Sequence, residues 1–219
     1  MKTATVIKAF MMFQTRLWIV WNASLKTALN LNEECMKYFV TSDTHFLHQR
    51  VMEFDSCQKH RSQYDHNLDS MNAGIITEWN SVVSPADTVF HLGDIACTND
   101  KNINNLLPDI LNMLNGHIIL VRGNHDTRTT VRIMKEFGHE VVDYYELRHN
   151  KNLICMSHYQ FAKWNRKPHG SVQLFGHAHG TTQQLFGRQL DVGWDVWGRL
   201  LPLEEAYRIA MSFDIDSRE

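Results

Sequence analysis

Five short motifs rich in aspartate and histidine recur along the chain, and each comes directly after a short apolar run. In open α/β folds, the segments that follow parallel strands meet beyond the carboxyl edge of the sheet. Residues two apart in extended chain point to the same side, so a D-x-H or H-x-H pair can aim two side chains at one place. The pattern therefore favours a fold that gathers its strand ends at one site. The motifs are Asp43-Thr44-His45, Gly93-Asp94, Gly123-Asn124-His125-Asp126, His158 and Gly176-His177-Ala178-His179.

Strand and helix signals alternate from Tyr38 onward, which predicts a layered α/β fold. The expected strands cover residues 38–42, 88–92, 118–121, 153–157, 172–175 and 189–193. The expected helices cover residues 64–82, 103–114 and 130–137, and a last helix opens at Pro202. Ser62 and Asp65 resemble a capping box before the first helix, and Pro108 is expected to split the second or to open its second half.

A chain of 219 residues is long enough to bury one core, and we expect one domain over residues 36–219. Residues 1–35 are expected to form an N-terminal extension of uncertain role. Lys8 and Arg16 interrupt its apolar runs, which are too short to span a bilayer. A signal peptide is the less favoured reading of this extension, since it would need a longer apolar region and a small-residue cleavage site.

Charge and cysteine usage narrow the class of protein. The formal net charge is -2, which gives no global signal for nucleic acid or an anionic membrane. The four cysteines form no C-x-x-C pair, so neither a zinc knuckle nor a dithiol redox site is indicated, and a reducing cytoplasm is the default location. Five of the thirteen histidines fall in the motifs, which gives the excess of histidine a cause.

The motif side chains are carboxylates, imidazoles and one amide, with no thiolate. This set suits manganese, iron, zinc or nickel better than a structural zinc site, which favours cysteine. A carboxylate such as Asp94 can bridge two ions, and such a pair lowers the pKa of a bridging water and stabilises in-line displacement at phosphorus. The sequence thus predicts a centre with two divalent ions, of which manganese is favoured. A motif histidine that is not needed as a ligand is then the natural general acid.

The same motifs resemble the calcineurin-like metallophosphoesterases, whose signature is D-x-H, G-D, G-N-H-[DE], H and G-H-x-H. The resemblance covers Met36 to the C-terminus and implies two packed mixed β-sheets flanked by helices, a four-layer sandwich. It implies one ion held by Asp43, His45, Asp94 and His179, and a second held by Asp94, Asn124, His158 and His177. It also implies that Asn124 and His125 contact the phosphate, that His125 protonates the leaving group, and that Asp126 orients it.

One departure from the family bears on the substrate. The phosphoprotein phosphatases read G-D-x-x-D-R-G, whereas this chain lacks the arginine after Gly93-Asp94. We therefore expect a small phosphodiester or nucleotide-type phosphoester rather than a phosphoprotein. Arg122 or the basic segment 163–167 could supply the missing cation. A metal-dependent nuclease is the second enzyme reading, although the net charge does not favour it. A non-catalytic binding scaffold of the same fold is the alternative from another class.

A few residues in or near the motifs have more than one possible role. A helix N-cap role for Asp126 is as well supported as a catalytic one. His91 is expected to be a core histidine whose polar atoms are hydrogen-bonded, and His48 is more readily explained outside the site than within it. The basic segment 163–169 is favoured as a solvated turn over a substrate contact. Asp191 and Asp195 are expected to serve turn chemistry rather than metal binding.

Overall fold

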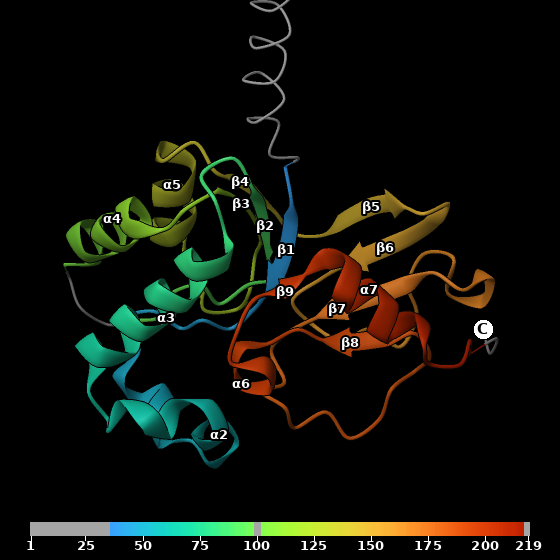
Figure 1. The fold of residues 1–219 in the computed structure, drawn as a ribbon, viewed down its shortest axis with the longest axis horizontal. Coiled ribbons are helices and arrows are strands. Elements are labelled where there is room, and N and C mark those ends of the chain that lie inside the picture. Colours follow the sequence, from blue (N-terminus) through green and yellow to red (C-terminus); the bar gives the residue numbers. More distant parts are fainter. Residues whose placement is uncertain (1–35, 99–101, 217–219) are drawn as a thin grey trace, which may run out of the picture. The chain divides into compact units, whose positions relative to one another are not determined.

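Two β-sheets form the centre of the computed structural model, which describes residues 36–98 and 102–216 (Figure 1). The expected extension, residues 1–35, lies outside the described residues. One sheet has the strand order β4-β3-β2-β1-β9, and the other has the order β5-β6-β7-β8. The strands are β1 (Tyr38–Thr41), β2 (Thr88–His91), β3 (His117–Val121), β4 (Glu140–Val142), β5 (Tyr145–His149), β6 (Asn152–Met156), β7 (Val172–Phe175), β8 (Gln189–Asp191) and β9 (Leu201–Pro202).

Both sheets are mixed. β1 to β4 run parallel, and β9 pairs antiparallel with β1. β6 to β8 run parallel, and β5 pairs antiparallel with β6. Every residue of β2 and β7 is buried, as expected for parallel strands that are covered on both faces. The predicted fold class, two packed mixed sheets flanked by helices, is confirmed.

Helices cover the outer face of the five-stranded sheet. Trp79, Leu107 and Ile133, one from each of the three main helices, share a core cluster with Val89 and Ile118 of the sheet. Each of these helices presents a stripe of apolar residues at helical spacing, which is buried against the strands. The helices are α2 (Gln58–Arg61), α3 (Leu68–Val82), α4 (Ile103–Met113), α5 (Arg128–Glu136), α6 (Trp194–Trp197) and α7 (Leu203–Met211), and the 3-10 turns are η1 (Gln49–Glu53), η2 (Asp55–Cys57), η3 (Ser62–Tyr64) and η4 (Lys167–His169).

A second core cluster fills the space between the two sheets. Val40 and Phe90 of the five-stranded sheet meet Ile154 and Leu174 of the four-stranded sheet there. α7 closes this core along one side, where Ala206 and its neighbours pack in the same cluster. The packing holds the carboxyl ends of β1, β2, β3, β6 and β7 close together, and this arrangement positions the site.

Three expectations about the helices are wrong. α3 begins at Leu68 rather than near residue 64, because Asp65 and His66 adopt left-handed backbone conformations that end the 3-10 turn before it. Its N-cap is Asn67, whose side-chain oxygen accepts from the amide of Ser70 at 2.9 Å, so the Ser62 and Asp65 capping box does not form. α4 continues through Pro108 without a break.

The sequence reading also left several short elements unpredicted. β4, β9 and α6 are two to four residues long, too short to carry a periodic signal. β5 does alternate between half-buried and exposed residues, so its signal was present and was missed. Of the helices in the described residues, none combines the length and apolar character needed to cross a membrane.

Candidate metal centre

The five motifs meet at one place in the structure. Asp43 follows β1, Asp94 follows β2 and Asn124 lies just beyond β3, all from the five-stranded sheet. His158 lies just beyond β6 and His177 beyond β7, both from the other sheet. The site therefore lies where the carboxyl ends of both sheets converge, which is the position predicted for ligand sites in open α/β sheets.

One cluster consists of Asp43, His45 and His179. The Nε2 atoms of His45 and His179 each lie 3.9 Å from Oδ1 of Asp43. The buried atoms Asp43 Oδ1 and His45 Nε2 have no hydrogen-bond partner among the described residues. Ligand atoms around one ion bound at ~2.1 Å lie roughly 3–3.6 Å apart. The 3.9 Å separations are too long for hydrogen bonds and slightly wider than this range, so a shared cation would draw the side chains closer by a few tenths of an ångström.

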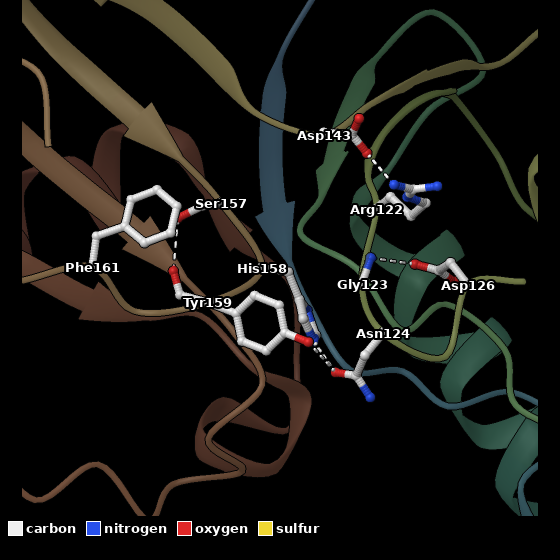
Figure 2. Close-up of a pocket in the computed structure, with 9 residues that line it drawn as sticks. All are labelled: Arg122, Gly123, Asn124, Asp126, Asp143, Ser157, His158, Tyr159 and Phe161. Atoms are coloured by element: carbon white, nitrogen blue, oxygen red, sulfur yellow. Dashed lines mark hydrogen bonds and ion pairs between the residues drawn. The ribbon is translucent and has the colours of Figure 1, made fainter.

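A second cluster consists of Asp94, His158 and His177. Oδ2 of Asp94 lies 3.4 Å from Nε2 of His158 and 3.7 Å from Nε2 of His45 in the first cluster. Oδ1 of Asn124 lies 3.0 Å from Nε2 of His158, and Figure 2 shows the two side chains pointing toward each other. Asp94 is thus placed between the clusters, as a bridging carboxylate must be. Most of these donors are buried, although His177 is exposed and His179 is half-buried, and their oxygens and imidazoles fit a divalent ion in each cluster.

The ring nitrogens that face away from the clusters are engaged elsewhere. Nδ1 of His158 lies 2.8 Å from the carbonyl oxygen of Leu92. A carbonyl oxygen only accepts, so Nδ1 carries the proton and Nε2 is left as a metal ligand. Nδ1 of His45 lies 3.0 Å from Nδ1 of His48. His48 therefore lies at the site and supports a candidate ligand, contrary to the favoured sequence reading.

Asp195 has a larger role than turn chemistry, which corrects the sequence reading. Its Oδ2 lies 2.7 Å from Nδ1 of His179, so it orients that candidate ligand. Its Oδ1 accepts from Nε of Arg61 at 2.6 Å, and both side chains are fully buried. Arg61 also donates to the backbone carbonyls of Asp43 and Thr44. Neither Arg61 nor Asp195 belongs to one of the five motifs. Their contacts join distant segments, so the spacing of residues along the sequence gave no sign of them.

Asp191, by contrast, has the expected turn role, because it accepts from the amide of Gly193 at 2.8 Å.

The loops that carry the clusters adopt costly backbone conformations. Asp43, His45, Asp94, His177 and His179 all have φ between 46° and 68°, in the left-handed region that non-glycine residues seldom occupy. Each such residue costs about 1–3 kcal/mol, and such residues gather at functional sites.

Glycine is needed beside two of these loops. A Cβ at Gly123 would lie 2.6 Å from the amide nitrogen of Asp94, and one at Gly176 would lie 2.5 Å from Oδ2 of Asp43. The glycines in these two motifs therefore allow neighbouring loops to approach closely.

Burial and charge set the protonation of the first cluster. Burial raises the pKa of the Asp43 carboxyl to about 7, against the opposing charge of His179. Burial alone would lower the pKa of His179, but its hydrogen bonds with Asp195 and Cys57, together with the negative charges of Asp43 and Asp195, outweigh burial and raise that pKa to about 10. A cation that binds these two side chains must displace their protons, so metal affinity at this cluster should rise with pH.

His125 and Asp126 have different surroundings. The exposed His125 ring lies 5.4 Å from the His45 ring, and its Nδ1 lies 3.4 Å from the thiol sulfur of Cys97. Asp126 is buried and accepts from the amides of Asp94 and Gly123, both at 2.8 Å. Burial raises its pKa to about 6. The N-cap of α5 is Thr127, so the N-cap reading of Asp126 is wrong. The hydrogen bonds of Asp126 join the G-D and G-N-H-D loops, and the atom found beside Nδ1 of His125 is the sulfur of Cys97. The expectation that Asp126 orients the His125 ring directly is therefore corrected, because Asp126 accepts from backbone amides instead.

The remaining predictions from the sequence have different outcomes in the structure. His91 is buried as expected, and its Nε2 bonds Oγ1 of Thr44 at 2.9 Å, but its Nδ1 is unpartnered among the described residues. The segment 163–169 is not simply solvated, because Lys167 is buried and its Nζ lies 3.0 Å from Oδ2 of Asp216. Arg122 lies beside the site, where its guanidinium pairs with Asp143 at 2.8 Å.

A cavity of about 450 Å³ adjoins the second cluster. Asn124 and His158 line it on the side of the cluster, and Arg122, Tyr159 and Phe161 line its other walls (Figure 2). A volume of this size falls within the range of small-molecule sites. The centre therefore combines candidate metal ligands with room for an organic group next to them.

Known proteins resemble the chain in sequence and fold. An uncharacterized protein from Methanocaldococcus jannaschii is 38% identical over 90 residues, which cover 41% of this chain and 47% of that protein, so the match spans about half of its length. The Gene 66 protein of Mycobacterium phage L5 is 27% identical over 198 residues, covering 76% of this chain and 90% of that protein. The crystal structure of a protein of unknown function from Aquifex aeolicus has a TM-score of 0.60 and 22% identity, covers 80% of this chain and 99% of its own, and shares the fold.

A match to a family model shows the family itself. The model of the calcineurin-like phosphoesterase superfamily domain matches residues 36–190. This range includes all five motifs, and its start coincides with the start of the described structure. The chain belongs to the calcineurin-like phosphoesterase superfamily.

Proposed function

We propose that this protein is a phosphoester hydrolase that requires two divalent metal ions and prefers diesters or nucleotide-type esters. The observation that carries the proposal is the pair of adjacent clusters with Asp94 between them. A carboxylate shared by two such clusters is the arrangement that two-metal phosphoryl-transfer sites require. A structural metal site would instead be a single closed shell, typically rich in cysteine.

Each ion would have four protein ligands, with Asp94 shared between them. The first ion would be held by Asp43, His45, Asp94 and His179, and the second would be held by Asp94, Asn124, His158 and His177. Manganese is the favoured ion, and iron, zinc or nickel suits the same donors. When bound, the two ions supply Lewis-acid activation of a water molecule and neutralise charge on the phosphoryl oxygens.

The chain's own residues supply the rest of the chemistry. His125 is exposed beside the first cluster, where it can donate a proton to the leaving oxygen as the ester bond breaks. Asn124 and His125 would contact the phosphate. Asp126 fixes the loop that presents both residues, through its hydrogen bonds to backbone amides. Cys97 restrains the His125 ring through the contact of its sulfur with Nδ1.

The substrate preference follows from two features. The arginine that would clamp a dianionic phosphoprotein ester is absent after Gly93-Asp94. Arg122 lies at the cavity, but Asp143 neutralises it. A small phosphoester is therefore the proposed substrate. The proposed location is the cytoplasm, and no membrane partner is proposed. A nuclease would need a broad basic surface, and a scaffold protein would be expected to have lost ligand positions, whereas every signature position is retained here.

The test compares substrates in the presence and absence of metal. Protein treated with a chelator should be inactive and should recover with Mn²⁺. Catalytic efficiency should be higher on bis(p-nitrophenyl) phosphate than on p-nitrophenyl phosphate, and lowest on a phosphopeptide. Full activity in metal-free protein would exclude the mechanism, and a preference for the phosphopeptide would exclude the substrate class while leaving the metal centre intact.

A further inference from the structure

The cavity beside the second cluster has an aromatic wall. Tyr159 follows His158 directly, and its ring lies edge-on to the rings of His158 and His177, at 5.0 Å and 4.6 Å between centroids. Its hydroxyl lies 3.3 Å from Oδ1 of Asn124. The side chain is nevertheless 46% exposed, so a large aromatic surface beside the phosphate position faces the cavity without cover from the described residues.

Phe161 extends this wall away from the metal centre. Its ring stacks on that of Tyr144, with centroids 6.2 Å apart and planes 29° apart. Two hydrogen bonds hold the backbone of Tyr159 and Phe161 in place. Ser157 donates to the carbonyl oxygen of Tyr159 at 2.8 Å, and the buried Gln173 accepts from the amide of Phe161 at 3.1 Å. The aromatic wall is therefore held in place rather than being a loose surface turn.

The opposite wall is polar. Arg122 follows β3 and Asp143 follows β4, and their side chains pair at 2.8 Å at the edge of the cavity (Figure 2). The pair supplies guanidinium donors and carboxylate acceptors with little net charge. A lipid or an alkyl group would gain nothing from this wall, and a second phosphate would gain little, because Asp143 offsets the attraction of Arg122. A planar heterocycle with donors and acceptors on its edge matches both walls.

We propose that this cavity is a nucleoside subsite, in which the base stacks on Tyr159 and presents its polar edge to Arg122 and Asp143 while its phosphate lies at Asn124 and His125. This inference rests on the proposed phosphoesterase function and specifies its substrate as a nucleotide-type ester. Stacking of a base on an aromatic side chain is worth roughly a 5- to 150-fold change in affinity. Tyr159 is thus a specificity-determining residue of the site.

The experiment measures binding rather than turnover. Protein loaded with Mn²⁺ is titrated with thymidine 5′-monophosphate and with methyl phosphate in a calorimeter. Both ligands carry the same phosphate group, and only the first has a base. The nucleotide should bind roughly 5- to 150-fold more tightly than methyl phosphate. Equal dissociation constants for the two ligands in the wild-type protein would overturn the subsite.

Three variants separate the ring from its hydroxyl and from general effects. Tyr159→Leu should remove most of the preference for the nucleotide, while Tyr159→Phe, which keeps the ring, should retain it. Phe137→Leu, which changes an exposed aromatic at the C-terminal end of α5, should leave the preference unchanged. A preference that survives Tyr159→Leu, or that is lost in Tyr159→Phe, contradicts stacking as its cause.

Turnover of a matched pair of esters distinguishes the two proposals. Methyl p-nitrophenyl phosphate and the p-nitrophenyl ester of thymidine 5′-monophosphate release the same leaving group. If both are hydrolysed at equal kcat/KM and nucleotide binding shows no preference, the hydrolase stands and the subsite fails. If neither is hydrolysed but the binding preference and its loss in Tyr159→Leu persist, the subsite stands and the hydrolase proposal fails.

Discussion

Asp94 and His125 lie in the same centre, but their contacts give them separable tasks. Oδ2 of Asp94 lies within 3.7 Å of a histidine from each cluster, so Asp94→Ala should lose metal and activity together. His125 contacts Cys97 and belongs to neither cluster. His125→Ala should therefore retain its metals and lose turnover by roughly 10²- to 10⁴-fold, the usual contribution of a general acid. Metal content by elemental analysis, measured alongside kcat, tests both variants.

The leaving group provides the control for that prediction. A p-nitrophenolate leaves without a proton, so His125→Ala should lose least on p-nitrophenyl esters and most on esters with an alkoxide leaving group. Loss of a metal in His125→Ala would contradict the assignment of this residue as an acid rather than a ligand.

Asp195 gives a second prediction for a single residue. Asp195→Asn removes the charge that orients His179 and leaves the buried guanidinium of Arg61 unpaired. Metal affinity should fall about 10- to 100-fold. The free energy of unfolding should fall by about 3–5 kcal/mol, because an uncompensated charge remains in the core. Calorimetric metal titration and urea denaturation measure the two effects.

The exposed pair Arg132 and Glu136 is the matched control, with a similar nitrogen to oxygen distance of 2.7 Å. Glu136→Gln should change the free energy of unfolding by less than about 1 kcal/mol and leave metal affinity unchanged. Equal effects of Asp195→Asn and Glu136→Gln would show that burial of the Asp195 pair has no special importance.

The candidate site was predicted from sequence only where local spacing encodes it. Asp43 and His45 are two residues apart after an apolar strand, and this pattern is visible in any single chain. Arg61 and Asp195 are 134 residues apart, and only the folded chain brings them together. Arg61 and Asp195, which position the candidate ligands, were therefore not predicted from the sequence in that role, whereas the candidate ligands were.

At the scale of elements, β2 and α3 share one pH-dependent contact. The His91 ring in β2 stacks on Trp79 of α3, with centroids 6.4 Å apart, and is fully buried. Burial lowers the pKa of His91 to about 3. Below pH 6.5 the unfolded chain gains a proton at this residue that the folded protein excludes, so stability is lost as pH falls from 6.5 toward 3. The slope should approach about 1.4 kcal/mol per pH unit for this group.

His91→Gln should remove that slope, whatever its effect on stability at neutral pH. The free energy of unfolding, measured by urea denaturation from pH 4 to pH 7.5, should vary less with pH in the variant than in the wild type. His169→Gln, at an exposed position, should keep the wild-type profile. Parallel profiles for the wild type and His91→Gln would mean that His91 is protonated in the folded protein.

Elements were predictable from sequence in proportion to their length and burial. β2 and β7 are apolar runs bounded by turn residues, and both were found. The start of α3 was misplaced because the apolar spacing continues back to Tyr64, while the backbone at Asp65 turns left-handed. That turn depends on local conformational energies that hydrophobic periodicity does not report.

For the whole molecule, the boundary at Met36 gives a further prediction. All five motifs lie after Met36, and the family match begins there. A protein that begins at Met36 should therefore be expressed in soluble form, with the kcat/KM and melting temperature of the full chain. Insoluble or inactive truncated protein would instead make residues 1–35 part of the folded core. Comparison of the two proteins by activity assay and thermal denaturation decides between these outcomes.

The left-handed backbone of five candidate ligands limits how far selection can raise the thermal stability of this protein while keeping its activity. At Asp43, His45, Asp94, His177 and His179, glycine would fold at lower cost than the residue present. A library selected for heat resistance alone should accumulate glycine or asparagine at these positions, and a library selected for turnover should not. Stability and activity thus compete at the same five residues. Thermostable variants that keep the activity should therefore have their stabilising substitutions at other positions in the fold.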